Sequence, residues 1–285
     1  MSAPAAAERA ELVALAERAA RAAGELVHRG RPERLEVLAT KSSPTDVVTA
    51  MDTASEALLT ELLLGERPQD GLLGEEGGAA GGTSGVTWVV DPIDGTVNYL
   101  YGLPSYAVSV AAVVGGGAPG DRPDPTTWTV VAGCVHEPVS GRTWTASLGG
   151  GARLDGEPLR GPAEVPLGEA LVGTGFGYTP QRRAAQARVL SGVLPHVRDI
   201  RRAGVASIDL CAVGTGWLDA YYERGLQPWD HAAGALVAAE AGAVVRGLAP
   251  HEQASDRFCL AAAPGLAATL GDLVAGLDPL REDAV

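Results

Sequence analysis

The stretch from Thr87 to Pro104 constrains the fold more than any other part of the chain, with the sequence T-W-V-V-D-P-I-D-G-T-V-N-Y-L-Y-G-L-P. Its first four residues are apolar or β-branched, which predicts a buried strand over 87–90 that ends at Asp91. The next six residues carry two carboxylates, a hydroxyl and a turn glycine. We therefore interpret the rest of the chain as a scaffold around this stretch.

Either dipeptide D-P or D-G alone would predict only a turn, because Asp, Pro and Gly all favour turns. In the full string, Pro92 fixes one backbone angle and Gly95 allows the backbone to approach a ligand closely. The N–H groups of Gly95 and Thr96 are placed to face an anion. Carboxylates repel phosphate unless cations lie between them, and Mg²⁺ prefers carboxylate and carbonyl oxygens. The string therefore predicts metal-assisted phosphate chemistry.

The segment from Asp91 to Pro104 resembles the signature of the inositol monophosphatase family, the Mg²⁺-dependent, lithium-sensitive sugar phosphatases. The usual form of that signature is D-P-[IL]-D-G-T-T-N-F-x-x-G-x-P, and Val97 replaces its second threonine. Two further segments resemble the family in the same order, K-S-S-P-T-D-V-V-T-A-M-D and P-W-D-H-A-A-G-A-L-V-A-A-E-A-G-A, with Ala243 in place of the last glycine. The resemblance runs from about Lys41 to Gly242.

Two other acidic segments suit a metal site on their own evidence. Glu75 and Glu76 follow an apolar strand. A glutamate pair alone predicts an exposed turn. Here, however, a glycine-rich connector over 77–85 leads directly into the strand that ends at Asp91. Two strands that end in acids so close in sequence make a shared metal site easy to form. Asp230 begins a helix of small residues, where capping and metal binding are compatible roles.

The resemblance implies roles for individual residues. It implies one Mg²⁺ held by Glu75, Asp91 and the Ile93 carbonyl, a second held by Asp91, Asp94 and Asp230, and a weaker third near Glu75, with Glu76 in support. Catalysis by activated water is expected to use Glu75, Thr96 and Asp46, the last as a brace for the Thr96 hydroxyl. The residues expected to contact substrate are Asp94, Gly95, Thr96, Gly204, Val205, Ala206, Glu223 and Asp230.

Hydrophobic periodicity divides the chain into two halves with a boundary near 150–168. Residues 1–155 form an α+β half, with helices over 12–27 and 53–64, the second capped by Asp52, and an antiparallel sheet that includes strands over 106–114 and 126–135. Residues 156–285 alternate as an α/β half, with strands over 170–174, 197–201, 220–223, 243–246 and 258–262 and helices over 181–194, 207–214, 232–242 and 266–277. The family resemblance implies a layered αβαβα sandwich and a homodimer.

Composition excludes several classes of function. A net charge of −13 argues against a nucleic-acid-binding surface, yet it is compatible with a small phosphorylated substrate because bound metal reverses the local potential. Three distant cysteines without a CxxC pair predict a reduced, cytoplasmic protein. No apolar run approaches the roughly 20 residues of a membrane helix, and charged residues precede any apolar stretch at the N-terminus, so we expect neither a membrane span nor a signal peptide.

The substrate is predicted less directly than the chemistry. The segment D-A-Y-Y-E ends in Glu223, the position at which the inositol-cleaving branch accepts hydrogen bonds from inositol, so inositol 1-phosphate is the expected substrate. Histidinol phosphate, fructose 1,6-bisphosphate and a nucleotide 3′-phosphate remain alternatives, because phosphatases for these esters share the metal motifs. The segment R-R-A-G-V-A-S-I-D-L-C resembles the G-[ST]-A-A substrate loop of the family, with Val205 in place of its hydroxyl residue. A catalytically silent member of the family that acts through protein contacts is the alternative from another class.

Overall fold

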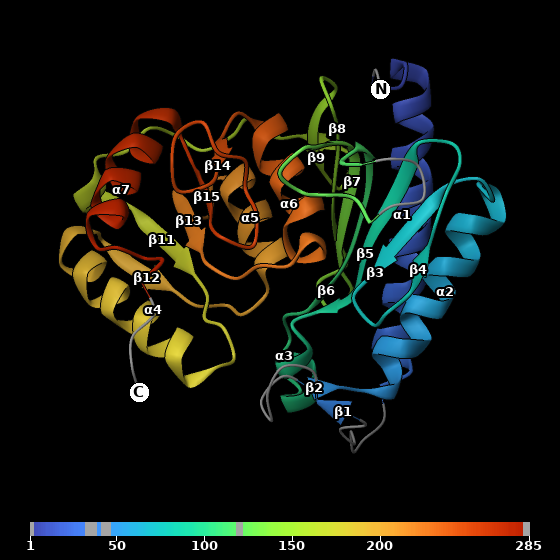
Figure 1. Cartoon of the computed structure of the whole chain (residues 1–285), viewed down its shortest axis with the longest axis horizontal. Helices are drawn as coiled ribbons and strands as arrows, with labels where there is room; N and C mark the ends of the chain where they lie inside the picture. Colours follow the sequence, from blue (N-terminus) through green and yellow to red (C-terminus); the bar gives the residue numbers. More distant parts are fainter. Residues whose placement is uncertain (1–2, 32–38, 41–46, 118–121, 282–285) are drawn as a thin grey trace.

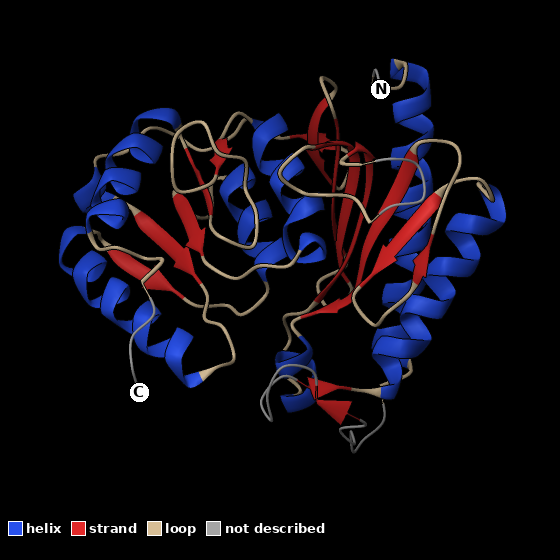
Figure 2. Ribbon diagram, viewed as in Figure 1, coloured by secondary structure: helices blue, strands red, loops and turns tan. Residues whose placement is uncertain are grey.

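The computed structural model describes residues 3–31, 39–40, 47–117 and 122–281. These residues form five layers, in which pairs of helices alternate with two β-sheets (Figure 1). The alternation of helix, sheet, helix, sheet and helix confirms the predicted αβαβα sandwich, and Figure 2 shows the same layers by secondary structure.

The first outer layer consists of α1 (Ala6–Arg29) and α2 (Ala50–Glu66), which pack on one face of the larger sheet. Alanines along one side of α1 are buried, and their small side chains let the helix lie close to the strands. Both predicted helices are confirmed, but the predicted cap of α2 is wrong. Thr49 occupies the N-cap position, and Asp52 lies in the first turn and accepts the Thr49 N–H at 2.8 Å.

The larger sheet has eight strands in the order β10-β9-β8-β7-β6-β5-β3-β4. Their bounds are β3 (Gly71–Gly74), β4 (Ala79–Ala80), β5 (Val86–Asp94), β6 (Ala107–Gly115), β7 (Trp128–Glu137), β8 (Arg142–Ser147), β9 (Gly151–Leu154) and β10 (Glu157–Pro158). The expected antiparallel sheet is wrong at one pair, because β3 and β5 are parallel. That pairing sets Gly74 opposite Val90, so Glu75 and Asp91 follow neighbouring strand positions.

The central layer consists of α5 (Ala206–Thr215) and α6 (Pro228–Ala241), which pack between the two sheets. The smaller sheet has the order β12-β11-β13-β15-β14, with strands β11 (Leu171–Thr174), β12 (Asp199–Arg201), β13 (Ala220–Glu223), β14 (Val244–Arg246) and β15 (Cys259–Ala262). The last layer, α4 (Pro180–Val193) and α7 (Pro264–Gly276), covers its outer face. The helices and strands predicted for this half are confirmed.

Several short elements complete the structure. A two-stranded sheet pairs β1 (Ala39–Thr40) with β2 (Val47–Val48), and α3 (Thr96–Tyr101) follows β5. Two 3₁₀ turns, η1 (Leu167–Glu169) and η2 (Leu194–His196), precede strands of the smaller sheet. The sequence patterns did not predict α3, because a six-residue helix is too short to show periodicity.

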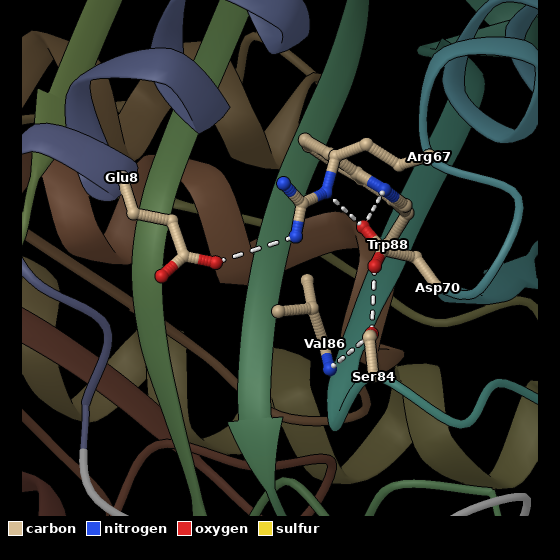
Figure 3. A network of polar contacts seen from close by, with 6 residues as sticks. All are labelled: Glu8, Arg67, Asp70, Ser84, Val86 and Trp88. Atoms are coloured by element: carbon tan, nitrogen blue, oxygen red, sulfur yellow. Dashed lines mark hydrogen bonds and ion pairs between the residues drawn. The ribbon is translucent and has the colours of Figure 1, made fainter.

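A buried polar network fixes the start of β5, at the end of the strand away from its aspartates (Figure 3). Asp70 is 3% exposed and accepts hydrogen bonds from the Trp88 indole at 3.0 Å and from Ser84 at 2.6 Å. Arg67, at the end of α2, pairs with Asp70 at 2.5 Å and reaches Glu8 of α1 at 3.4 Å. Both outer helices are therefore tied to the strand that carries Asp91.

Candidate active site

The strand β5 continues past the point where the sequence pattern ended it. It runs to Asp94, and its pairing with β6 shifts register between Asp91 and Asp94. Such an irregularity re-aims side chains at the end of a strand. Asp91 accepts the N–H of Ile93 at 3.0 Å, which fixes its carboxylate at the turn.

A cavity of about 470 Å³ lies where β3, β5 and α3 meet the loops before α4, α5 and α6. It brings together the predicted site residues Glu75, Asp91, Ile93, Asp94, Gly95, Thr96, Gly204, Val205, Ala206, Glu223 and Asp230. These residues come from segments more than 150 positions apart in the chain. Asp46, predicted to be catalytic, lies outside the described residues.

The acids of this cavity strongly affect one another. Burial, and then the charges of Glu75, Asp94 and Asp230, raise the pKa of Asp91 well above its ordinary value, and Glu75 lies within hydrogen-bonding reach of Asp91. Burial and the neighbouring acids also raise the pKa of Asp230. Burial raises the pKa of Asp94 to about 6, although the N–H of Ser207, 2.7 Å from its carboxylate, opposes the shift. Four carboxylates this close are unfavourable unless a cation compensates them.

The donor set of the cavity suits Mg²⁺, which is bound by hard oxygen ligands. Among the described residues, no three His, Cys, Asp or Glu side chains converge closely enough to form a ready-made metal site. The four acids nevertheless face one cavity, beside the Ile93 residue whose carbonyl was predicted as a ligand. The charges of the neighbouring acids raise the pKa of Asp91 and of Asp230, and a bound cation would remove this repulsion and draw the carboxylates together.

The hydroxyl of Thr96 is held by Asp52, a residue to which the sequence reading gave only a helix cap. Thr96 Oγ1 lies 3.1 Å from Asp52 Oδ1 and 3.0 Å from the carbonyl of Ile93. The other Asp52 oxygen accepts the backbone N–H of Thr49. The pattern T-A-M-D is a capping-box signal that identifies this helix start, but the contact with Thr96 depends on the tertiary structure.

Asn98 and Asp94 join the turn after β5 to the substrate loop before α5. The Asn98 amide donates to the carbonyls of Ser105 and Ala203, each at 2.9 Å. Val205, which replaces the expected hydroxyl residue, is fully buried, and a Cβ on Gly95 would lie 2.8 Å from its side chain. The side chain of Val205 therefore packs against Gly95 and supports the turn.

Glu223 faces the cavity from the end of β13. Its carboxylate accepts a hydrogen bond from Tyr221, and burial raises its pKa to about 7 against the effects of Tyr221 and Arg202. Gly175 makes room for it, since a Cβ there would lie 1.9 Å from Glu223 Oε2. Arg182, Arg202 and Asp209 also line the cavity, and the motif reading did not identify them.

Glu56, a buried residue of α2, positions the segment that carries Glu75. It is 6% exposed, and its carboxylate accepts the N–H groups of Glu76 and Gly78, each at 2.8 Å. A Cβ on Gly74 would lie 2.2 Å from this carboxylate, so the glycine is needed for the approach. Sequence reasoning missed Glu56, because nothing in the helix pattern distinguishes it from a surface glutamate.

The variant Glu56→Ala is expected to weaken metal binding by about 10- to 100-fold, since residues that support metal ligands have effects of this size. The measurement is the Mg²⁺ concentration that gives half-maximal phosphate release. Excess Mg²⁺ should restore turnover, which it would not do for a misfolded variant. Glu61→Ala, at an exposed position of the same helix, serves as the control. An unchanged Mg²⁺ requirement in Glu56→Ala would contradict the assigned role.

Known proteins match this chain in both sequence and fold. The model of the inositol monophosphatase family matches residues 8–281. The inositol-1-monophosphatase of Mycobacterium leprae is 50% identical over 242 residues, which are 81% of this chain and 78% of that protein. The Escherichia coli protein named Nus factor SuhB is 36% identical over 233 residues, or 81% of this chain and 83% of that one. The solved structure of Mycobacterium tuberculosis SuhB has a TM-score of 0.77 at 43% identity and covers 95% of this chain and 98% of its own.

The layered sandwich, its acid-lined cavity and these matches define a phosphatase with the fold of the sugar phosphatases. Within that class, the chain belongs to the inositol monophosphatase family.

Proposed function

We propose that the chain is a Mg²⁺-dependent phosphomonoesterase that hydrolyses inositol 1-phosphate to inositol and phosphate. The observation that carries this proposal is the convergence of Glu75, Asp91, Asp94 and Asp230 on one cavity that also contains Glu223. The names of the mycobacterial relatives support the substrate.

Glu75, Asp91, Asp94, Asp230 and the Ile93 carbonyl would hold about two to three Mg²⁺ ions. When bound, Mg²⁺ supplies Lewis-acid polarisation of the phosphate and lowers the pKa of water. Asp91 lies near the end of β5, and the Ile93 N–H fixes its carboxylate in a position where it would serve as a metal ligand. Lithium sensitivity is part of the same proposal.

The proton of the attacking water would pass to the side chains at the start of α2 and α3. Because Thr96 can donate its own proton to Asp52 or to the Ile93 carbonyl, its oxygen has lone pairs free to accept a hydrogen bond from water. This orients the water for attack on phosphorus and gives its proton a path toward Asp52. The N–H groups of Gly95 and Thr96 would bind phosphate oxygens, and Glu223 would bind hydroxyls of the leaving group.

The test is phosphate release from inositol 1-phosphate, histidinol phosphate, fructose 1,6-bisphosphate and a nucleotide 3′-phosphate. Each is measured with Mg²⁺, with EDTA, and with Mg²⁺ plus lithium. We expect turnover that requires Mg²⁺, is inhibited by lithium and favours inositol 1-phosphate. Preference for another ester would refute inositol 1-phosphate as the substrate. No phosphate release from any ester despite bound Mg²⁺ would refute the proposal that the protein is an enzyme.

The pH dependence of stability offers a second check, because the cavity acids hold protons in the metal-free folded state. Burial raises the pKa of Asp94 to about 6 and that of Glu223 to about 7. Their stabilisation is complete below the ordinary carboxyl pKa and is lost as pH rises through these values. Buried His231, with its pKa lowered to about 4, contributes in the opposite direction, but the raised acids outnumber it.

We therefore expect the melting temperature of EDTA-treated protein to fall between about pH 5 and about pH 8. The stabilisation by added Mg²⁺ should grow over the same range, because its ligands must lose their protons. Melting curves with EDTA and with Mg²⁺ at three pH values measure both effects. A Mg²⁺ shift that does not change with pH would show that these acids do not bind the ion.

We also propose a cytoplasmic homodimer. Tyr101, the last residue of α3, and Leu103, two residues beyond it, are 77% and 51% exposed, and exposed apolar side chains of this size suit a contact between copies. A sedimentation mass of two chains is expected, and a monomer at micromolar concentration would refute the dimer. None of the helices in the described ranges is long and apolar enough to cross a membrane.

A further inference from the structure

Asp209 differs from the other acids of the cavity. It lies in the first turn of α5, is 5% exposed and lines the cavity, yet nothing in the described part of the chain donates a hydrogen bond to its carboxylate. By contrast, Asp91, Asp94 and Glu223 each accept a hydrogen bond from the protein. Because Asp209 lines the cavity, its carboxylate is open to a donor from whatever occupies the cavity, and an occupant that displaces water from it without supplying a donor would bind less well.

The charges around Asp209 narrow the choice of donor. The acids that act on it are Glu223 and then Asp94, and the cation that acts on it is Arg202. Arg202 is exposed, and its guanidinium lies 5.8 Å from the centre of the Phe176 ring. Within the described residues it forms no ion pair with either carboxylate. Arg202 therefore reduces the repulsion between the two acids while leaving their oxygens open.

We propose that Asp209 is a further specificity residue of this cavity, which accepts a hydrogen bond from a hydroxyl of the alcohol part of the substrate next to the hydroxyl held by Glu223. Asp209 would then add to the selection of inositol 1-phosphate over phosphate esters that lack such a hydroxyl. The proposal rests on the proposed function and adds a residue to the same site. In their ionised forms the two carboxylates offer only acceptors, and hydroxyls supply the matching donors without adding charge. An ammonium group fits less well, because Arg202 already supplies positive charge there.

The experiment compares inositol 1-phosphate with p-nitrophenyl phosphate, whose leaving group has no aliphatic hydroxyl. Asp209→Asn and Asp209→Ala should raise KM for inositol 1-phosphate by about 10- to 100-fold, the effect of losing a hydrogen bond to a charged group, and leave kcat/KM for p-nitrophenyl phosphate unchanged. Glu223→Ala should show the same selectivity. Asp199→Asn makes the same charge change at an exposed residue paired with Arg201, and should alter neither ester.

Monodeoxy inositol phosphates locate the contact without relying on the fold of a variant. The wild-type protein should lose about 10- to 100-fold in kcat/KM on analogues that lack either of two adjacent hydroxyls. One of the analogues lacks the hydroxyl that Asp209 contacts. On that analogue, Asp209→Asn should have the same kcat/KM as the wild-type protein, because the interaction is already absent. Because the change removes a buried unpaired charge, the melting temperature of Asp209→Asn should not fall.

Three outcomes would overturn the inference. They are an equal loss on both esters, no loss on inositol 1-phosphate, and a wild-type preference for the ammonium-bearing histidinol phosphate that Asp209→Asn abolishes. If the wild-type protein releases phosphate from inositol 1-phosphate but the variants show no selectivity between the two esters, the role of Asp209 is refuted and the proposed function is not. Release from no ester by the wild-type protein refutes the proposed function instead.

Discussion

Asp91→Asn is expected to lower kcat for phosphate release from inositol 1-phosphate by at least about 1,000-fold, which corresponds to about 4 kcal/mol. Asp91 is 1% exposed, and its proposed role makes it a ligand shared by two ions. The amide keeps the shape of the carboxylate but removes the charge that the cations require. Because burial and neighbouring acids already raise the pKa of Asp91, loss of this charge should not destabilise the metal-free fold.

Calorimetric titration with Mg²⁺ and a melting curve complete this experiment. We expect weaker Mg²⁺ binding by Asp91→Asn together with a melting temperature in EDTA no lower than that of the wild type. Asp199→Asn, an exposed acid in the second half of the chain, controls for the change in net charge. Near-normal turnover in Asp91→Asn would refute the proposed mechanism, because that mechanism requires the negative charge of Asp91 as a metal ligand.

The acids at strand ends could be predicted from sequence because each one follows an apolar run directly. Glu75 and Asp91 end such runs, and the parallel pairing of their strands then places them side by side. The pairing itself could not be predicted, since a short hairpin through β4 hides the change of direction. Asp230 was found through its motif, although it accepts the Gln227 N–H at 2.7 Å in the first turn of α6 and does not begin the helix.

Residues that support the site were harder to predict because their partners are distant in sequence. Glu56 contacts backbone about 20 positions away, and Asn98 reaches the carbonyl of Ala203, 105 positions away. Asp209 appears in the sequence as an ordinary helical acid, and its significance comes from burial beside Glu223. Local sequence patterns predict strands and turns. The contacts of Glu56, Asn98 and Asp209 form only in the tertiary structure, so no local pattern predicts them.

Asp52→Ala is expected to lower kcat by about 100- to 1,000-fold, within the range for loss of a proton-transfer group. Its two oxygens have separate partners in the structure, since Oδ1 contacts the Thr96 hydroxyl and Oδ2 accepts both the N–H and the hydroxyl of Thr49. The variant should therefore lose catalysis and also about 1 kcal/mol of stability from the helix start. The measurements are kcat for inositol 1-phosphate and the free energy of unfolding in denaturant.

Two further variants separate these functions. Thr49→Ala removes the N-cap hydroxyl, whose oxygen lies 3.3 Å from the Met51 nitrogen and which donates to Asp52 Oδ2. It should cost about 1 kcal/mol of stability, and it should lower kcat far less than Asp52→Ala does, because the contact of Oδ1 with Thr96 remains. Thr96→Val removes the hydroxyl and should match the kcat of Asp52→Ala while keeping the stability. If Thr49→Ala were as inactive as Asp52→Ala, the helix start and not the contact with Thr96 would determine activity. Asp46→Ala tests the original expectation directly, because a loss of kcat there with Asp52→Ala unaffected would assign the brace to Asp46.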